Sequence, residues 1–213
     1  RRLVDGQGAR RVARAILEMV AGRQAAMKPR ALVGEKLYLR PLEKADATDE
    51  YLAWLHNPEV TRWLETGRFA TTLEQLRAYL GRFDGGTHHL GFAIVDRATG
   101  LHVGNVTLNN INWVHRTADT GLMIGRKEFW GKGYAFEAWS LVIEYAFERL
   151  NLRKVIAGVI PENEASWNVL RRLGFQVEGT LRAHVWAAGA YRDSVRLGML
   201  RDEFYKFARG ERT

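Results

Sequence analysis

The chain has 213 residues, of which 46% are hydrophobic and 26% are charged, and it contains no cysteine. This balance is typical of a globular protein with enough apolar mass for a core, and it excludes collagen-like and low-complexity chains. Without cysteine there are no disulfides and no thiolate nucleophiles, and the six scattered histidines lack an HExxH pair, so no metal site is expected. No run of apolar residues reaches the length of a membrane-spanning helix, so no membrane association is expected.

The net charge of +8 is concentrated near the N-terminus. Residues 1–33 contain eight basic residues against Asp5 and Glu18, which is +6 and leaves +2 for the rest of the chain. A nucleic-acid-binding protein carries its basic residues across a folded face, so nucleic acid is not an expected partner. The first 20 residues are basic and lack an uninterrupted apolar signal stretch, which favours a cytoplasmic location.

The pattern of apolar residues predicts helices and strands along the whole chain. Residues 9–21 have an apolar face at helical spacing and lie in a basic extension, residues 1–33, that precedes one domain over residues 34–213. In that domain the expected order is a strand over 36–42, helices over 46–56 and 72–83, strands over 89–96, 102–108 and 117–124, a long helix over 133–150, a strand over 154–159, a helix over 163–173, and strands over 175–186 and 191–200. This order predicts an α/β fold: a mostly antiparallel mixed sheet with an embedded parallel βαβ unit and helices on both faces.

A glycine-rich turn, residues 129–135 (FWGKGYA), lies between a predicted strand and the long helix. Glycines allow a ligand to approach the backbone closely, and the first N–H groups of a helix have no internal acceptor. With the helix dipole, these N–H groups form an anion site suited to a pyrophosphate. The turn matches neither the Walker loop nor the dinucleotide-binding fingerprint.

A second motif follows about thirty residues later: Asn163 and Ser166 lead to Gly174 and Phe175. In this order and context, the two motifs resemble the GNAT superfamily of acyl-CoA N-acyltransferases. The acetyl-CoA loop of that family reads Gln/Arg-x-x-Gly-x-Gly/Ala, and here Gly133 and Ala135 match while Trp130 takes the first position. The resemblance covers residues 36–200, and the spelling WGKGYAFEAW looks most like the branch that includes the ribosomal-protein N-acetyltransferases.

This resemblance implies a GNAT fold and direct transfer of an acetyl group from acetyl-CoA to a primary amine, with no metal. It also implies that the backbone of residues 131–135 holds the CoA pyrophosphate, that residues 122–124 pair with the pantetheine arm and supply the N–H that stabilises the oxyanion, and that Asn163 hydrogen-bonds the pantetheine. Asn is equally a favoured helix cap. The implied cofactor-binding residues are Leu122, Met123, Ile124, Gly131, Lys132, Gly133, Tyr134, Ala135 and Asn163.

The chain departs from the family pattern at the residue that serves as the general acid. Many family members have a tyrosine seven residues after the Asn, and here that position is Leu170. Ser166 is the substitute that the ribosomal-protein branch suggests. The candidate bases are His115, Asp119, Glu178 and His184, all with ordinary structural explanations as well. His115 and Asp119 are favoured because they precede the strand expected to line the acceptor cleft.

Two stretches, residues 51–65 and 111–119, look like acetyltransferases that modify aminosugars for bacterial surface polysaccharides. Their aromatic residues Trp54, Trp63 and Trp113 offer flat faces for a sugar or uracil ring, although core packing explains tryptophans equally well. The favoured acceptor is therefore a nucleotide-linked deoxy-aminosugar. Alternatives are the N-terminal amine of a ribosomal protein, and a module that binds acyl-CoA without catalysis.

The basic extension adds one more resemblance. Residues 4–13 are similar to the C-terminal end of nucleotide-sugar hydrolases of the pseudaminic-acid pathway. A fusion to such a hydrolase upstream is therefore expected, with an amphipathic docking helix as the alternative. A homodimeric assembly is compatible with these patterns.

Overall fold

The structure is a computed structural model that describes residues 32–66 and 68–208. The predicted helix over residues 9–21, the 4–13 resemblance and nearly all of the basic extension lie outside the described residues. Leu32 and Val33 form a short strand with the domain that follows, so the described sheet begins two residues before the predicted domain boundary.

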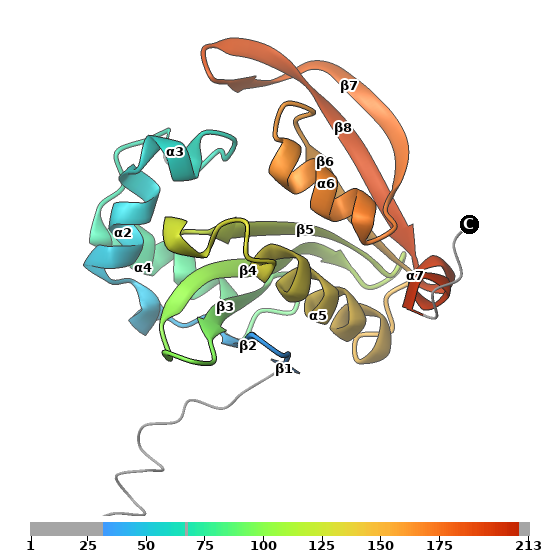
Figure 1. Ribbon diagram of the computed structural model, residues 1–213, viewed down its shortest axis with the longest axis horizontal. Helices are drawn as coiled ribbons and strands as arrows, with labels where there is room; N and C mark the ends of the chain where they lie inside the picture. The colour runs from blue at the N-terminus through green and yellow to red at the C-terminus, as the bar shows by residue number, and fades with distance from the viewer. Residues whose placement is uncertain (1–31, 67, 209–213) are drawn as a thin grey trace, which may run out of the picture. The chain divides into compact units, whose positions relative to one another are not determined.

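The described strands form a single sheet in the order β1-β2-β3-β4-β5-β6-β8-β7 (Figure 1). Adjacent strands in this sheet are antiparallel, except for β5 and β6, which run parallel. The strands are β1 (Leu32–Val33), β2 (Leu37–Pro41), β3 (Leu90–Asp96), β4 (His102–Asn112), β5 (Thr117–Ile124), β6 (Lys154–Val159), β7 (Gln176–Ala187) and β8 (Ala190–Leu200). The predicted mixed sheet with one parallel βαβ unit is therefore confirmed.

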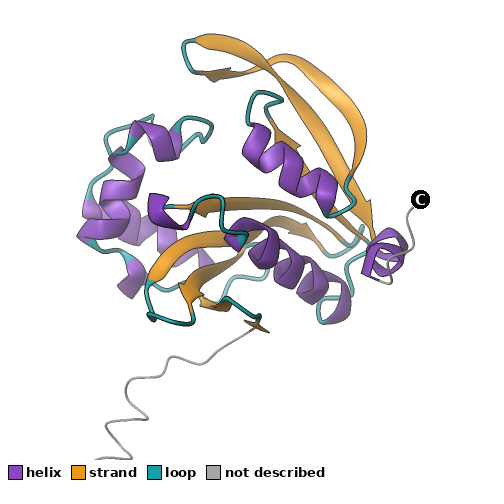
Figure 2. Cartoon of the chain, viewed as in Figure 1, coloured by secondary structure: helices purple, strands orange, loops and turns teal. Residues whose placement is uncertain are grey.

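Helices cover both faces of the sheet (Figure 2). They are α2 (Asp49–His56), α3 (Pro58–Thr61), α4 (Leu73–Leu80), α5 (Tyr134–Glu148), α6 (Glu164–Arg172) and α7 (Arg201–Ala208), with 3-10 turns η1 (Lys44–Asp46), η2 (Gly81–Phe83) and η3 (Lys127–Phe129). None of the helices in the described part of the chain is long and apolar enough to cross a membrane.

Alternate residues of β3 show how the two layers pack. Phe92 and Ile94 belong to the apolar cluster that contains α5, whereas Ala93 and Val95 belong to the cluster formed with α2 and α4. Because successive side chains of a strand point to opposite faces, α5 lies on one face and α2 and α4 lie on the other. β3 is buried on both faces, which explains its nearly continuous apolar sequence.

Local residue types explain where several of the helices begin. Thr72 caps α4 in a capping box with Gln75, Asn57 caps α3 before Pro58, and Gly133 precedes the first turn of α5. Two predictions need correction. Residues 46–56 split into η1 and α2 because Thr48, in extended conformation, caps a new helix. The C-terminal helix α7 was not predicted.

Candidate active site

The parallel pair of strands is short and then opens. Its pairing starts at Thr117 with Lys154 and ends at Asp119 with Ile156, although β5 continues to Ile124. Beyond Asp119, the β6-facing edge of β5 has no strand partner among the described residues. Apart from the Ile124 carbonyl, which accepts the Trp130 indole N–H, the backbone N–H and C=O groups on that edge are therefore available to a ligand.

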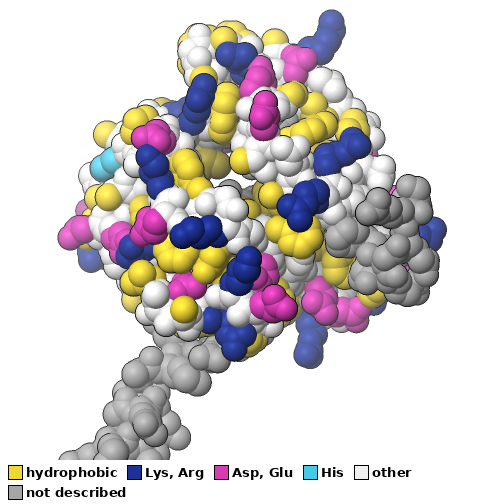
Figure 3. Space-filling view, in the orientation of Figure 1, with side chains coloured by type: hydrophobic (Ala, Val, Ile, Leu, Met, Phe, Trp, Pro, Cys, Tyr) yellow, Lys and Arg dark blue, Asp and Glu magenta, His cyan; other side chains and the backbone are white. Residues whose placement is uncertain are grey.

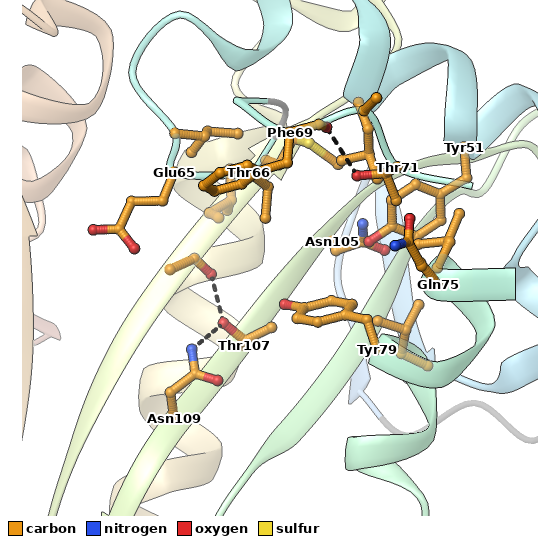
Figure 4. A pocket seen from close by; sticks show the side chains of 18 residues that line it. Tyr51, Glu65, Thr66, Phe69, Thr71, Gln75, Tyr79, Asn105, Thr107 and Asn109 are labelled. Atoms are coloured by element: carbon orange, nitrogen blue, oxygen red, sulfur yellow. Dashed lines mark hydrogen bonds between the residues drawn. The ribbon is translucent and has the colours of Figure 1, made fainter. Parts of the chain in front are cut away.

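A cavity of about 490 Å³ lies at this opening, and Figure 3 shows the surface hollowed there. One wall consists of the segment after α3 together with part of α4, and the other consists of α6, β7 and β8. The charged residues that line it are Glu65, Arg68, Arg82, Asp119 and Arg196. A second cavity of about 610 Å³ extends from it beneath α2 and α4 (Figure 4), since both are lined by Leu64, Glu65, Tyr79, Asn109, Gly121 and Leu122.

The glycine-rich turn before α5 has the predicted open backbone. Gly131 and Gly133 have φ angles of 70° and 87°, a region that favours glycine, and no described residue lies within 4 Å of where a Gly131 side chain would start. The first helical bond within α5 runs from the Glu137 N–H to the Gly133 carbonyl, so the preceding N–H groups have no acceptor inside the helix. This geometry suits an anionic group such as the CoA pyrophosphate.

Two side chains hold this turn against the sheet. The Trp130 indole N–H donates to the Ile124 carbonyl at 2.8 Å, and the Lys36 ammonium donates to the Lys132 carbonyl at 2.8 Å. The first contact joins the turn to the end of β5. Trp130, which takes the Gln/Arg position of the family motif, thus has a structural role of its own.

Asn163 and Ser166 interact with each other in the first turn of α6. The Asn163 side-chain oxygen accepts the Ser166 N–H at 3.4 Å, and the Asn163 amide donates to Ser166 Oγ at 3.1 Å. Asn163 is therefore the N-cap of α6, as its residue type predicted. Because Ser166 Oγ accepts from Asn163, its hydroxyl hydrogen can donate into the cavity that both residues line.

Asp119 faces Arg196 across the same cavity. Asp119 Oδ1 lies 3.6 Å from Arg196 Nη1, beyond hydrogen-bonding distance, and the two side chains are 39% and 42% exposed. A side chain at Gly158 would start 3.1 Å from Arg196 Nη1. The glycine therefore leaves room for the guanidinium to lie over β6 and approach Asp119.

The other predicted bases have different positions. His184 lines the cavity from β7, whereas Glu178 forms an ion pair with Lys154. His115 is exposed in the turn before β5 and lines neither cavity. It precedes Asp119 by four residues, which corresponds to about 13 Å along an extended strand. The structure therefore does not bring His115 to Asp119 and Ser166.

The three predicted substrate-binding tryptophans do not form one cluster. Trp63 lines the cavity, with the Arg62 guanidinium 4.8 Å from its ring centroid. Trp113 lines neither cavity, and its indole donates to the Thr87 carbonyl. Trp54 is 6% exposed in the core, where its ring occupies the space left by Gly125. Trp54 is thus a packing residue, because α2 turns its apolar face toward the sheet.

Sequence reasoning missed polar residues that α4, η2, β4 and β8 contribute. Arg82 and Arg196 line the first cavity, and Gln75 and Asn105 line the second. The one available signal was Asn105, a polar residue inside an apolar strand. In the described part of the chain, no cluster of His, Asp and Glu could hold a metal ion.

Comparisons with known proteins agree with this geometry. The family model of the acetyltransferase (GNAT) domain matches residues 36–176. The chain belongs to the GNAT acetyltransferase family. Spermidine N(1)-acetyltransferase of Escherichia coli (strain K12) is 33% identical over 78% of this chain and 87% of its own length.

Solved GNAT structures share the fold. Spermidine N-acetyltransferase from Vibrio cholerae, crystallised with CoA and spermine, superposes with a TM-score of 0.73 at 25% identity, over 81% of this chain and 99% of that one. The ribosomal-protein-S5-alanine acetyltransferase from Vibrio fischeri superposes with a TM-score of 0.70 at 24% identity, over 81% and 97%. The predictions of a GNAT fold, an N-acetyltransferase and acetyl-CoA as co-substrate are confirmed.

Proposed function

We propose that this acetyltransferase acetylates the primary amine of a small neutral or anionic molecule, and that a nucleotide-linked deoxy-aminosugar is its acceptor. The observation that supports the proposal is the charge of the first cavity. Among the described residues, Arg68, Arg82 and Arg196 line it against two carboxylates, Glu65 and Asp119. Guanidinium groups bind phosphate well, so this lining suits an acceptor that carries a diphosphate.

The main rival is a polyamine, because the E. coli and V. cholerae relatives are spermidine acetyltransferases by name. A polyamine has several ammonium groups, and these prefer a site rich in carboxylates. The arginines of the cavity argue against it. The third candidate, the N-terminal amine of a protein, rests on the ribosomal-protein resemblance of the sequence.

For acetyl-CoA, we propose binding along two backbone segments. The N–H groups of residues 131–135, which include Lys132, Tyr134 and Ala135, would hold the pyrophosphate. The free edge of β5 between Leu122 and Ile124 would pair with the pantetheine arm as an added strand does, and its N–H groups would stabilise the oxyanion.

The chemistry that follows is direct transfer. The amine nitrogen attacks the thioester carbonyl carbon, the carbon–sulfur bond breaks, and the proton lost by the amine ultimately goes to the CoA sulfur. Asp119 would accept the proton from the amine, directly or through water. Ser166 would donate its hydroxyl proton to the thiolate and regain a proton from Asp119 through water. His184 is the second candidate base on the same cavity wall.

The experiment is to measure free-thiol release from acetyl-CoA with three acceptors: a UDP-4-amino-4,6-dideoxy sugar, spermidine and an N-terminal peptide. The proposal expects turnover on the sugar nucleotide. Turnover on spermidine or the peptide alone would overturn it, and CoA binding without any turnover would favour a different acceptor or a non-catalytic module. The homodimer, the upstream fusion and the cytoplasmic location stay predictions.

Arg196→Gln tests the charge argument within the cavity. We expect the KM for the sugar nucleotide to rise about tenfold, since a hydrogen bond to a charged group contributes about 1.5–3 kcal/mol. Arg77→Gln is the matched control, because Arg77 is exposed on α4 and lines neither cavity. An equal rise in KM in both variants would show that Arg196 does not contact the acceptor.

A further inference from the structure

The larger cavity beneath α2 and α4 contains a buried hydrogen-bond donor without a partner. Asn105 on β4 is 5% exposed, and its side-chain nitrogen, Nδ2, has no hydrogen-bond partner among the described residues. The residue lines this cavity (Figure 4). A buried donor without a partner is costly, so such a group in a native fold requires an explanation.

His102 fixes which way the Asn105 amide points. His102 Nε2 lies 2.9 Å from both the Gly104 carbonyl oxygen and Asn105 Oδ1. A ring nitrogen between two acceptor oxygens must carry the proton. Rotating the amide by half a turn would place its NH₂ group against that N–H, so Oδ1 faces His102 and Nδ2 stays unpaired. Burial lowers the pKa of His102, which favours the neutral ring.

Gln75 supplies a second amide oriented in the same way. Its Oε1 accepts the Thr72 N–H at 2.9 Å in the capping box of α4. The NH₂ end of Gln75 is therefore the end left for the cavity that it lines. Figure 4 shows Asn105, Gln75 and Tyr51 together at one end of this cavity.

The cavity thus offers hydrogen-bond donors within aromatic walls. Tyr51, Phe69 and Tyr79 contribute rings, and Glu65 is the one charged residue of the described chain that lines it. An ammonium group has donors only and would leave the amide N–H groups unpaired. A ring with carbonyl oxygens would pair with them and stack on the aromatic side chains.

We propose that this cavity is a specificity pocket for a planar ring bearing carbonyl oxygens, and that the NH₂ groups of Asn105 and Gln75 bind those oxygens. The volume of about 610 Å³ lies within the range of small-molecule sites. That the ring is part of the acceptor rests on the proposed function. The continuity of the two cavities supports it, because one molecule can place its amine near Asp119 and its ring beneath α4.

The test is calorimetric titration of the CoA-bound enzyme with uridine, whose base has two ring carbonyls, and with ribose, which has none. We expect uridine to bind the wild type and ribose not to bind. In Asn105→Leu, uridine binding should weaken at least tenfold while CoA affinity and the melting temperature do not fall, because the substitution removes a buried unpaired donor. Asn105→Asp keeps the volume and the acceptor for His102, and it should lose uridine binding as well.

Asn168→Leu is the matched control: Asn168 is exposed on α6 and lines neither cavity, so uridine binding should be unchanged. Equal uridine affinity in Asn105→Leu and the wild type, or no binding to the wild type, would overturn the pocket. Because uridine binding is measured without turnover, the proposed acceptor and the proposed pocket can fail independently. Turnover on spermidine alone, with uridine binding still dependent on Asn105, overturns only the proposed acceptor. Turnover on the sugar nucleotide without uridine binding overturns only the pocket.

Discussion

The glycine-rich turn and the cleft formed by the two adjoining cavities are built in opposite ways. The turn consists of seven consecutive residues, 129–135, and offers backbone N–H groups at the start of one helix. The cleft consists of side chains that are far apart in the sequence, from Trp63 after α3 to Arg196 on β8. A backbone site tolerates side-chain changes except at its glycines, whereas a side-chain site changes its ligand with each substitution. One family can therefore keep its cofactor and vary its acceptor.

The largest expected effect is a loss of stability when the buried ion pair between Arg40 and Asp46 is broken. Arg40 donates to Asp46 from both terminal guanidinium nitrogens, at 2.8 and 2.6 Å, in a buried ion pair near His102. Asp46→Asn should cost about 3–5 kcal/mol in the free energy of unfolding, because it leaves the arginine buried without a charged partner. Urea denaturation at pH 7 measures it. A loss below 1 kcal/mol would show that the cleft side does not depend on this pair.

The ion pair between Arg40 and Asp46 should also make the stability of the fold depend on pH. Burial raises the pKa of Asp46, but the hydrogen bonds from Arg40 and from the Glu43 backbone, with the charge of Arg40, outweigh it and hold the pKa below the ordinary value of 3.8. A carboxylate with a lowered pKa stabilises the fold above its unfolded pKa, and this stabilisation is lost as the pH falls through the folded value. The stability difference between wild type and Asp46→Asn should thus be constant above about pH 5 and shrink below pH 3.8.

Ser166→Ala should lower kcat about 100-fold and leave CoA affinity unchanged, because general-acid catalysis contributes at least that factor. Steady-state kinetics together with CoA titration separate the two effects. Ser140→Ala is the control, since Ser140 is half-buried on α5 and lines neither cavity. Near-normal turnover in Ser166→Ala would leave the thiolate to take its proton from water.

Gly133→Ala should weaken CoA binding about tenfold, because a β-carbon in the left-handed region costs about 1–2 kcal/mol. The KM for the acceptor should stay constant. Gly100→Ala introduces the same strain at φ 72° in the β3–β4 turn, remote from either cavity. It should lower the melting temperature without changing CoA affinity. If both variants lost CoA affinity to a similar extent, the loss in Gly133→Ala would be due to reduced stability and not to a changed CoA site.

The smallest effect is expected at His115. Its exposed turn lies outside the cleft, so His115→Ala should change kcat/KM by less than about twofold, whereas Asp119→Asn should lower it tenfold or more. The pH–rate profile of each variant gives a second measure. If His115→Ala lowered kcat/KM as much as Asp119→Asn does, the turn between β4 and β5 would have to lie beside the acceptor. That result would contradict the position of His115 in the structure.

Local patterns in the chain predict most of the strands and helices, together with the glycine-rich turn. Period-two and period-3.6 patterns predicted the strands and helices within a few residues, and Thr72, Gly133 and Asn163 occupy the caps that their residue types favour. These signals are readable because capping and backbone conformation depend on neighbours a few residues away.

Which side chains meet in the cleft depends on the tertiary structure. Trp54 and Trp63 are nine residues apart and look alike in the sequence, yet the first fills the core and the second lines the cavity. Arg196 approaches Asp119 because β8 pairs with β6 and Gly158 leaves it space. Asn105 faces a cavity only because α2 and α4 lie over β4. Such contacts depend on the register and packing of distant segments, which no local pattern in the chain encodes.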